Sequence, residues 1–592
     1  MARGPLKGIA ALVGAAVRDP KRLLRWASSA VTEARTGGAE AVRRKLSSGT
    51  GAYQQWIARY DTIEESDRAA IERRLATLTR TPTFSILMPV YNVDETWLRE
   101  AIDSVLDQIY PHWELCLVDD ASSEPHVRGV LDDYAARDAR VRVAFRTDNG
   151  HISAASNTAL ALATGEFIAL LDHDDLLAPH ALFMVALELE EHPDADLLYS
   201  DEDGIDEAGE RFKPMFKPDF APELLLSVNC ISHLGVYRTS IVREAGGFRV
   251  GFEGSQDLDL ALRVVERSAA ERIRHIPHVL YHWRAIPGSV QTGGGAKEYA
   301  HDAARRAIAE HLARRGETAN VTQGFRRLHR VTVELPVPAP LVTLVIVAAA
   351  DSAALERTLV SLAESTGYDP FEIIVVTSAG ASMGAASASA TRSISAVVGT
   401  RASAVDAARG TVVVFVRAGL VAREPFWLHD LVAHALRDGV GAVGGRIVEA
   451  DGAIVAAGLA IGADGEALEL YRGARSDEPG QLYRAQVLGN YTACSAALLA
   501  ARRAGLAEAG VPDRLSDDDV AAGAAICARL RARGRRIVWT PHSELVATAV
   551  AERATSRAKP AAFVDPMLSP NLAPSGTGVV LASPPGVAKP WR

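Results

Sequence analysis

Short apolar runs alternate with amphipathic stretches along most of the chain from residue 53 onward. Runs rich in branched and aromatic residues predict strands, and stretches with apolar residues at helical spacing predict helices. The expected strands are residues 84–90, 113–118, 141–145 and 166–171, and the expected helices are residues 53–80, 96–108, 127–137 and 153–164. This alternation predicts an α/β fold with a mostly parallel sheet covered on both faces.

A second series of the same kind follows the Pro-rich residues 335–340. It comprises expected strands at 341–347 and 372–376 with an expected helix at 353–365. At one constant offset, residues 84–90 align with 342–348 and residues 114–118 align with 372–376. We interpret this as an internal duplication of a whole domain. The alternative is a chance resemblance between two α/β segments.

Composition and charge narrow the range of functions and cellular locations that we expect for this protein. The 592 residues suffice for several domains, and 48% hydrophobic with 23% charged residues is ordinary for a globular protein. The formal net charge of −9 argues against nucleic acid as a partner. The four cysteines are far apart, with no disulfide framework or metal-binding spacing, which favours a cytoplasmic location. No apolar run is as long as a membrane span.

The N-terminal segment, residues 1–52, is basic and amphipathic. Its cationic residues are Lys7, Arg18, Lys21, Arg22 and Arg25, set among apolar residues such as Leu12, Leu23 and Trp26. Such a helix can lie on an anionic membrane surface, here the inner face of the cell membrane. The alternative is a solvated leader or a helix packed on the rest of the protein.

We expect four further regions along the chain. They are a helical lead-in at 53–82, a first α/β domain at 83–330, a second at 341–550 and a C-terminal tail at 551–592. The tail is rich in Pro and Gly from about Ser583, so we expect it to be partly disordered.

An acidic cluster directly follows one of the expected strands. Leu170 and Leu171 run into Asp172-His173-Asp174-Asp175. Open α/β sheets bind ligands at the edge where such strands end, and carboxylate oxygens suit Mg²⁺ or Mn²⁺. The alternative is that Asp174 or Asp175 only caps the next helix.

Several motifs occur in a fixed order around this cluster. They are Pro89-Val90-Tyr91-Asn92, Val118-Asp119-Asp120-Ala121-Ser122, Ser156-Asn157, Gly165-Glu166-Phe167, Leu171-Asp172-His173-Asp174-Asp175, Gly246-Gly247-Phe248 and Gln256-Asp257-Leu258-Asp259-Leu260. Each motif is weak alone, but together they make residues 83–290 resemble a family 2 glycosyltransferase with the GT-A fold. That fold binds nucleotide sugars.

The resemblance implies a metal site for Mn²⁺ or Mg²⁺. Asp172 and Asp174 match the family's DxD pair, with Asp174 as the direct metal ligand and Asp172 nearer the donor ribose or a metal-bound water. His282 occupies the position of a late metal or diphosphate contact, and Arg284 could pair with the diphosphate. A structural histidine at position 282 is the alternative.

The resemblance also implies a nucleotide pocket. Asp120 matches the contact to the nucleotide base, and Pro89 and Tyr91 match the wall of the base pocket. Asn157 belongs to the same donor-binding set. The residues alone also allow a turn at Asp119-Asp120 and a core position for Tyr91.

Asp257 matches the family's catalytic carboxylate. It would accept the proton of the acceptor hydroxyl in a single displacement, which predicts inversion at the anomeric carbon. The alternative is that Asp257 caps the helix that follows. His233 lies before an expected strand and could face the acceptor.

The second half lacks these residues. Thr377-Ser378 stands in place of Asp119-Asp120, and Arg417-Ala418-Gly419 in place of Asp172-His173-Asp174. We therefore expect a degenerate GT-A-like domain that binds a glycan acceptor, braces the first domain or mediates a homodimer. An active transferase with a metal-free site is the alternative.

The leading prediction is an inverting, metal-dependent glycosyltransferase. Its donor would be a nucleotide-diphosphate sugar, and its acceptor a glycan or lipid-linked glycan of the cell surface. The alternatives are transfer to polyprenyl phosphate, a non-catalytic glycan-binding or scaffold protein, and a nucleotidyltransferase. The last is disfavoured because residues 89–94 form no Gly-rich, basic phosphate loop.

Overall fold

The structure is a computed structural model. It describes residues 50–286, 298–347, 352–377, 394–462, 465–512, 518–548, 556–557, 564–575 and 578–591. The expected basic helix within residues 1–52 lies almost wholly outside the described residues, so its membrane contact stays a prediction. Within the described parts of the chain, no helix is long and apolar enough to cross a membrane.

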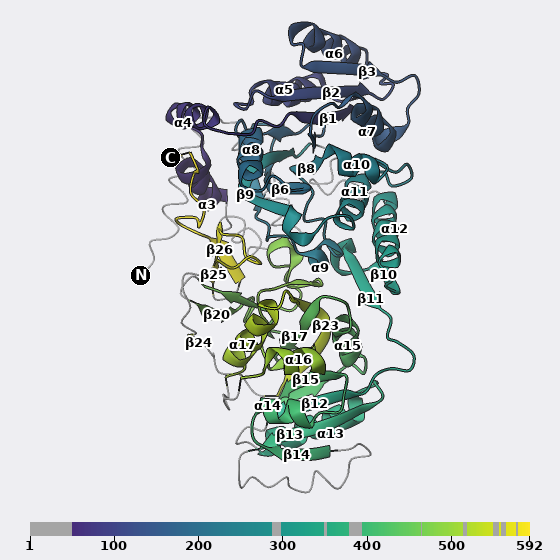
Figure 1. Ribbon diagram of the computed structural model, residues 1–592, viewed down its shortest axis with the longest axis vertical. Coiled ribbons are helices and arrows are strands. Elements are labelled where there is room, and N and C mark those ends of the chain that lie inside the picture. Colours follow the sequence, from purple (N-terminus) through teal and green to yellow (C-terminus); the bar gives the residue numbers. More distant parts are fainter. Residues whose placement is uncertain are drawn as a thin grey trace, which may run out of the picture.

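The first half is built on a nine-stranded sheet, at the top of Figure 1. The strand order is β3-β2-β1-β4-β8-β6-β9-β5, with β7 paired to β6. The strands are β1 Phe84–Val90, β2 Trp113–Asp119, β3 Val141–Phe145, β4 Phe167–Leu170, β5 Leu176–Leu177, β6 Leu197–Ile205, β7 Arg211–Met215, β8 Gly235–Arg238 and β9 Ile273–Arg284. The sheet is parallel from β3 to β4, and β8 then runs antiparallel to both β4 and β6.

Helices cover both faces of this sheet, which confirms the predicted α/β fold class. They are α5 Glu95–Leu106, α6 Pro125–Arg137, α7 His151–Leu162, α8 Ala181–Glu191, α9 Pro222–Leu225, α10 Thr239–Glu244, α11 Gln256–Val265 and α12 Glu298–Arg314. Along β1, Ile86 and Met88 belong to the core shared with α5 and α8, and Leu87 belongs to the core shared with α7 and α11. A strand buried on both faces must be apolar at almost every position, as β1 is.

The second half contains a ten-stranded sheet with the same order of equivalent strands, β14-β13-β12-β15-β22-β17-β23-β16. Its strands are β12 Val342–Val347, β13 Phe371–Thr377, β14 Ile394–Val398, β15 Val412–Arg417, β16 Leu420–Ala422, β17 Val440–Val448, β18 Ile454–Ala456, β21 Gly489–Asn490, β22 Leu498–Arg502 and β23 Arg536–Ala547. Its helices are α13 Ser352–Ser365, α14 Arg401–Ala407, α15 Trp427–Ala435, α16 Arg503–Ala509 and α17 Asp519–Arg531.

A hydrogen-bonded corner repeats at the start of both sheets. In the first half, the Gly165 N–H donates to Ser85 Oγ at 2.8 Å, and Ser85 Oγ donates to Glu114 at 2.6 Å. In the second half, the Gly410 N–H donates to Thr343 Oγ1 at 2.9 Å, and Thr343 donates to Glu372 at 2.7 Å. The two halves therefore share this detail as well as their strand order.

Four smaller groups of elements lie outside the two large sheets. The hairpin of β10 Ala319–Gln323 and β11 His329–Val333 precedes the second half, and β19 Leu459–Ile461, β20 Glu466–Glu469 and β24 Ser556–Arg557 form a small sheet. The lead-in contains α3 Thr50–Trp56, a π-helical turn at Ile57–Asp61 and α4 Glu65–Leu75, and the tail contains the hairpin of β25 Leu572–Ser575 and β26 Gly578–Leu581.

The last described residues of the tail are packed against the first half, and the expected partial disorder of the tail stays a prediction. Trp591 is 8% exposed and contacts the rings of His180 and Phe183. Its indole N–H donates to Asp67 in α4 at 3.0 Å, and Lys589 Nζ lies 2.7 Å from the same carboxylate. Figure 1 accordingly shows the C-terminal end beside α4 and α8.

Candidate functional site

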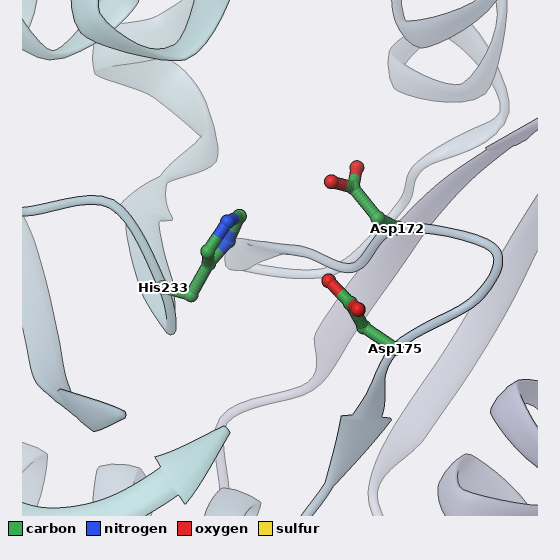
Figure 2. A group of neighbouring side chains, drawn as sticks. All are labelled: Asp172, Asp175 and His233. Carbon is green, nitrogen blue, oxygen red and sulfur yellow. The ribbon is translucent and has the colours of Figure 1, made fainter. Parts of the chain in front are cut away.

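An acidic loop, residues 171–175, connects β4 to the short strand β5. Figure 2 shows Asp172 and Asp175 from this loop, and His233 from the loop before β8, facing a common space. One ligand atom from each of the three side chains lies within 4.8 Å of the other two. Two carboxylates and an imidazole at this spacing can hold a divalent cation.

Asp175 is the most deeply buried member of this cluster. Its Oδ2 accepts a hydrogen bond of 2.6 Å from the Tyr281 hydroxyl, and its Oδ1 accepts one of 2.7 Å from the Arg284 N–H. Burial, followed by the charges of Asp174 and Asp172, raises the pKa of Asp175 well above its usual range. A bound cation would offset this concentration of negative charge.

The pKa of Asp172 is raised, as is that of Asp175. Burial raises the pKa of Asp172, and Asp174 and Asp257 raise it further, while His233 and His173 oppose the shift. Because the charge of Asp257 acts on Asp172, the carboxylate expected to be catalytic belongs to the same electrostatic site as the acidic loop.

His233 is held in place on three sides. Its ring stacks on Tyr281 with centroids 4.3 Å apart, and its backbone N–H donates to the Glu202 carboxylate at 3.0 Å. Its carbonyl accepts a hydrogen bond of 2.6 Å from Lys217. The Nδ1 atom is buried and has no hydrogen-bond partner among the described residues. An imidazole with one unpartnered ring nitrogen, and with a ring nitrogen within 4.8 Å of two carboxylates, fits a metal ligand.

This cluster coincides only in part with the expected site residues, and the roles expected of Asp174 and His282 as ligands stay predictions. The cluster contains Asp175 and His233, where the sequence predicted Asp174 and His282. His282 lies on β9 and its Nδ1 is hydrogen-bonded to Asp203 at 2.7 Å. Sequence order alone cannot distinguish Asp174 from Asp175, because the turn after β4 decides which carboxylate points inward.

Arg284 anchors the acidic loop instead of standing free for a diphosphate. Its Nε donates to the Asp174 carbonyl at 2.7 Å, and its Nη2 pairs with Glu100 of α5 at 2.6 Å. The guanidinium also lies over the Trp97 ring, 4.3 Å from the centroid. The guanidinium therefore already has partners of its own in this structure.

Asp257 lies in the first turn of α11. Its Oδ2 accepts a hydrogen bond of 2.6 Å from the Asn229 side chain. Its neighbour Asp259 is fully buried and pairs with Arg249 and Arg263. The two carboxylates of this motif therefore have different partners. Asp257 accepts from an amide, whereas Asp259 is ion-paired and anchors α11.

The residues expected to form the nucleotide pocket differ in their exposure. Tyr91, directly after β1, is 46% exposed, which excludes a core position. Asp120 is buried, and its Oδ1 accepts hydrogen bonds from Arg146 Nε at 2.7 Å and from the Gly150 N–H at 3.0 Å. The carbonyl of Pro89 contacts His173 Nδ1 at 3.0 Å.

Asn157 serves the loop that precedes α11. Its amide donates to the Phe248 carbonyl at 2.7 Å and accepts from the Phe248 N–H at 2.9 Å. A Cβ at Gly247 would approach Asn157 Oδ1 to 2.5 Å, so only glycine fits there. The structure gives Asn157 a supporting role, and its expected contact with the donor stays a prediction.

Sequence reasoning missed three adjacent acids on β6, which are Asp201, Glu202 and Asp203. All three are at most 1% exposed. Asp201 and Asp203 pair with His275 and His282, while Glu202 pairs with Lys217 at 3.0 Å. The available signal was three consecutive acids inside an otherwise apolar strand, because buried carboxylates require partners.

The second half shows no comparable group of three metal-binding side chains among its described residues. Arg417 ends β15 at the position that Asp172 has after β4. Asp519, in the first turn of α17, forms a buried ion pair with Arg401. Arginine therefore compensates the helix-start carboxylate here.

Comparison with known proteins identifies the family. Residues 85–246 match the family described as Glycosyl transferase family 2. The putative glycosyltransferase EpsE of Bacillus subtilis is 32% identical over 31% of this chain and 67% of its own length. The chain belongs to glycosyltransferase family 2. The family match ends within the first half, so it covers the acidic loop and His233 but not Asp257.

Two longer relatives extend beyond the family 2 segment. The uncharacterized protein y4gI of Sinorhizobium fredii is 39% identical over 87% of this chain, and the O-antigen biosynthesis protein RfbC of Myxococcus xanthus is 36% identical over 70%. The chain spans 61% of the first relative and 33% of the second. Among solved structures, Staphylococcus aureus TarS 1–349 in complex with UDP-GlcNAc is 21% identical, with a TM-score of 0.33, over 39% of this chain and 66% of its own.

Proposed function

We propose that this protein is an inverting, metal-dependent glycosyltransferase. It would move a sugar from a nucleotide-diphosphate donor to a glycan or lipid-linked acceptor in the synthesis of a cell-surface polysaccharide. The observation that carries the proposal is the convergence of Asp172, Asp175 and His233 beside the charge of Asp257. The name of RfbC, an O-antigen biosynthesis protein, supports the proposed role in polysaccharide synthesis.

Asp172, Asp175 and His233 are the residues that would hold Mn²⁺ or Mg²⁺. The cation would act as a Lewis acid that neutralises the departing diphosphate. Tyr281 and the Arg284 N–H fix Asp175, and Glu202 fixes the backbone of His233, so the ligands are held in place before the donor binds. Asp174 adds negative charge in the same loop.

Asp257 is the proposed catalytic base. The acceptor oxygen forms a bond to the anomeric carbon while the bond from that carbon to the diphosphate oxygen breaks, and the hydroxyl proton passes to Asp257. A single displacement of this kind inverts the anomeric configuration. Asn229 holds Oδ2 of the carboxylate, which leaves Oδ1 as the atom proposed to take the proton.

The proposed nucleotide end of the site lies at the ends of β1 and β2. The exposed ring of Tyr91 offers a surface on which the base can stack, and the carboxylate of Asp120 is fixed by its hydrogen bonds from Arg146 and the Gly150 N–H. Aromatic stacking and a fixed carboxylate would orient the donor for in-line attack.

The test is binding of a panel of nucleotide-diphosphate sugars with and without Mn²⁺, followed by transfer to glycan, lipid-linked and polyprenyl-phosphate acceptors. We expect one donor to bind in a metal-dependent way, and Asp172→Asn to weaken that binding by about tenfold or more. Calorimetry with the wild type and the variant measures the effect.

Asp132→Asn is the matched control, because Asp132 is an exposed acid on α6, away from the acidic loop. It should bind the donor like the wild type. An equal loss in both variants, or metal-independent binding throughout, would contradict the metal site. No binding of any donor would favour a glycan-binding scaffold.

A further inference from the structure

We infer that the second half of the chain positions the catalytic carboxylate of the first half. It does so through the bracing segment, defined here as residues 216–234, which runs from the contact between the halves to the acidic loop. This inference rests on the proposed function, because it concerns the base and a metal ligand of the same site.

A buried cluster of charges ties the bracing segment to the second half. Glu223, in α9, is 1% exposed and lies 3.0 Å from Arg536 and 3.4 Å from Arg437. Asn490 Nδ2 donates to its carboxylate at 2.6 Å, and Asn490 Oδ1 accepts from its backbone N–H at 2.9 Å. All three partners belong to the second half. Arg536 begins β23, Arg437 follows α15, and Asn490 lies on β21.

Apolar side chains also pack between the two halves beside this charge cluster. Leu224, Leu225 and Leu226 are buried in one cluster with Val487 from the second half. The Asp219 N–H donates to the Pro566 carbonyl at 2.8 Å. The start of the bracing segment is thus fixed by groups outside the first sheet.

The other end of the bracing segment reaches the site. Asn229 donates from its amide to Asp257 at 2.6 Å and accepts at Oδ1 from the Ser232 N–H at 3.1 Å. Lys217 Nζ donates to the carbonyls of Ile231 and His233 at 3.1 and 2.6 Å. The bracing segment therefore presents both the partner of the base and one proposed metal ligand.

The link between these ends is short. The N–H groups of Ser227 and Val228 donate to the Leu224 carbonyl at 2.9 and 2.8 Å, so the chain turns directly from α9 toward Asn229. A displacement of Glu223 would therefore displace Asn229 as well. In this arrangement Glu223, Arg536 and Asn229 are positioning residues.

The experiment compares the full-length wild type with Arg536→Ala and Arg536→Lys. Arg536→Ala leaves Glu223 with Arg437 and Asn490, so the variant should still fold, with a melting temperature a few degrees below that of the wild type. We expect kcat to fall by about ten- to a hundredfold. Binding of the nucleotide diphosphate should change by less than about twofold, because Glu202 and Tyr281 hold His233 independently of Arg536. Arg536→Lys should recover most of the loss.

Arg409→Ala is the control, because it removes an ion pair to Glu372 inside the second half. It should leave kcat unchanged. An unchanged kcat in Arg536→Ala, or a loss of nucleotide binding as large as the loss of kcat, would overturn the inference.

Hydrogen exchange separates this inference from the proposed function. Amides 224–234 should exchange faster in Arg536→Ala than in the wild type or in Arg409→Ala, whether or not a donor has been identified. Unchanged exchange would refute the coupling itself, whereas faster exchange in a protein without transferase activity would refute only the proposed function.

Discussion

Several buried charges in the first half are ion-paired, and the pair of Glu202 with Lys217 is among the most deeply buried of those described above. Both side chains are 1% exposed, and Lys217 also donates to the carbonyls of Ile231 and His233. One ammonium group therefore joins β6 to the loop that carries a proposed metal ligand. Sequence patterns could not reveal this pair, because the two residues are brought together only by the antiparallel return of β7 along β6.

Lys217→Met should destabilise the protein by about 3–5 kcal/mol, because Glu202 would stay buried without a cationic partner. The double variant Lys217→Met/Glu202→Gln should regain a large part of that loss, since no charge remains to be compensated. Urea unfolding of both variants and the wild type measures the difference. A loss below about 1 kcal/mol in Lys217→Met would show that water or another group replaces the ammonium.

At the scale of elements, the apolar runs of the sequence predicted the central strands well. The expected strand at 84–90 is β1 without change, and the expected helix at 96–108 is α5 within two residues at each end. The strand β6 was missed, because its three consecutive acids break the apolar pattern. Periodicity reports which face of an element is buried, and it cannot report that a buried carboxylate has found an ion-pair partner.

The repeated corner gives a prediction for each sheet. A Cβ at Gly165 would lie 2.6 Å from the Thr83 carbonyl oxygen, and one at Gly410 would lie 2.5 Å from the Thr343 nitrogen. Because backbone atoms cannot move aside cheaply, Gly165→Ala and Gly410→Ala should each cost about 1–3 kcal/mol. Gly129→Ala in α6 is the control, since nothing lies within 4 Å and alanine favours helix. Thermal unfolding compares the three, and equal midpoints would contradict the steric argument.

At the scale of the molecule, the two halves share a strand order but not a site. Only the first half gathers carboxylates and an imidazole within its described residues, and the second half offers Arg437 and Arg536 to Glu223. The sequence predicted a second α/β series without the acidic residues. It could not predict how the halves touch, because that contact depends on residues far apart in the chain.

Acid should weaken the contact between the halves in a defined range. Burial opposes ionisation, but Arg536 and Arg437 overcome it and lower the pKa of Glu223 to about 2. A lowered pKa stabilises the fold above the usual glutamate value near 4.3, by about 3 kcal/mol here, and this contribution is lost as the pH falls toward 2. The advantage of the wild type over Glu223→Gln in urea midpoints should therefore be constant above about pH 5 and shrink below it. An advantage independent of pH would argue against this charge cluster.

The packing of Trp591 and Lys589 against Asp67 also bears on how the protein is made. During translation the first half emerges from the ribosome before the second. Asp67 is nevertheless 1% exposed in the complete fold, and both of these partners follow the second half in the chain. Asn571 similarly donates to the buried Asp201 on β6 at 3.1 Å. The first sheet therefore cannot reach its final set of contacts during its own synthesis. It must wait in an incomplete state until the distal residues emerge, which makes this protein dependent on events late in translation.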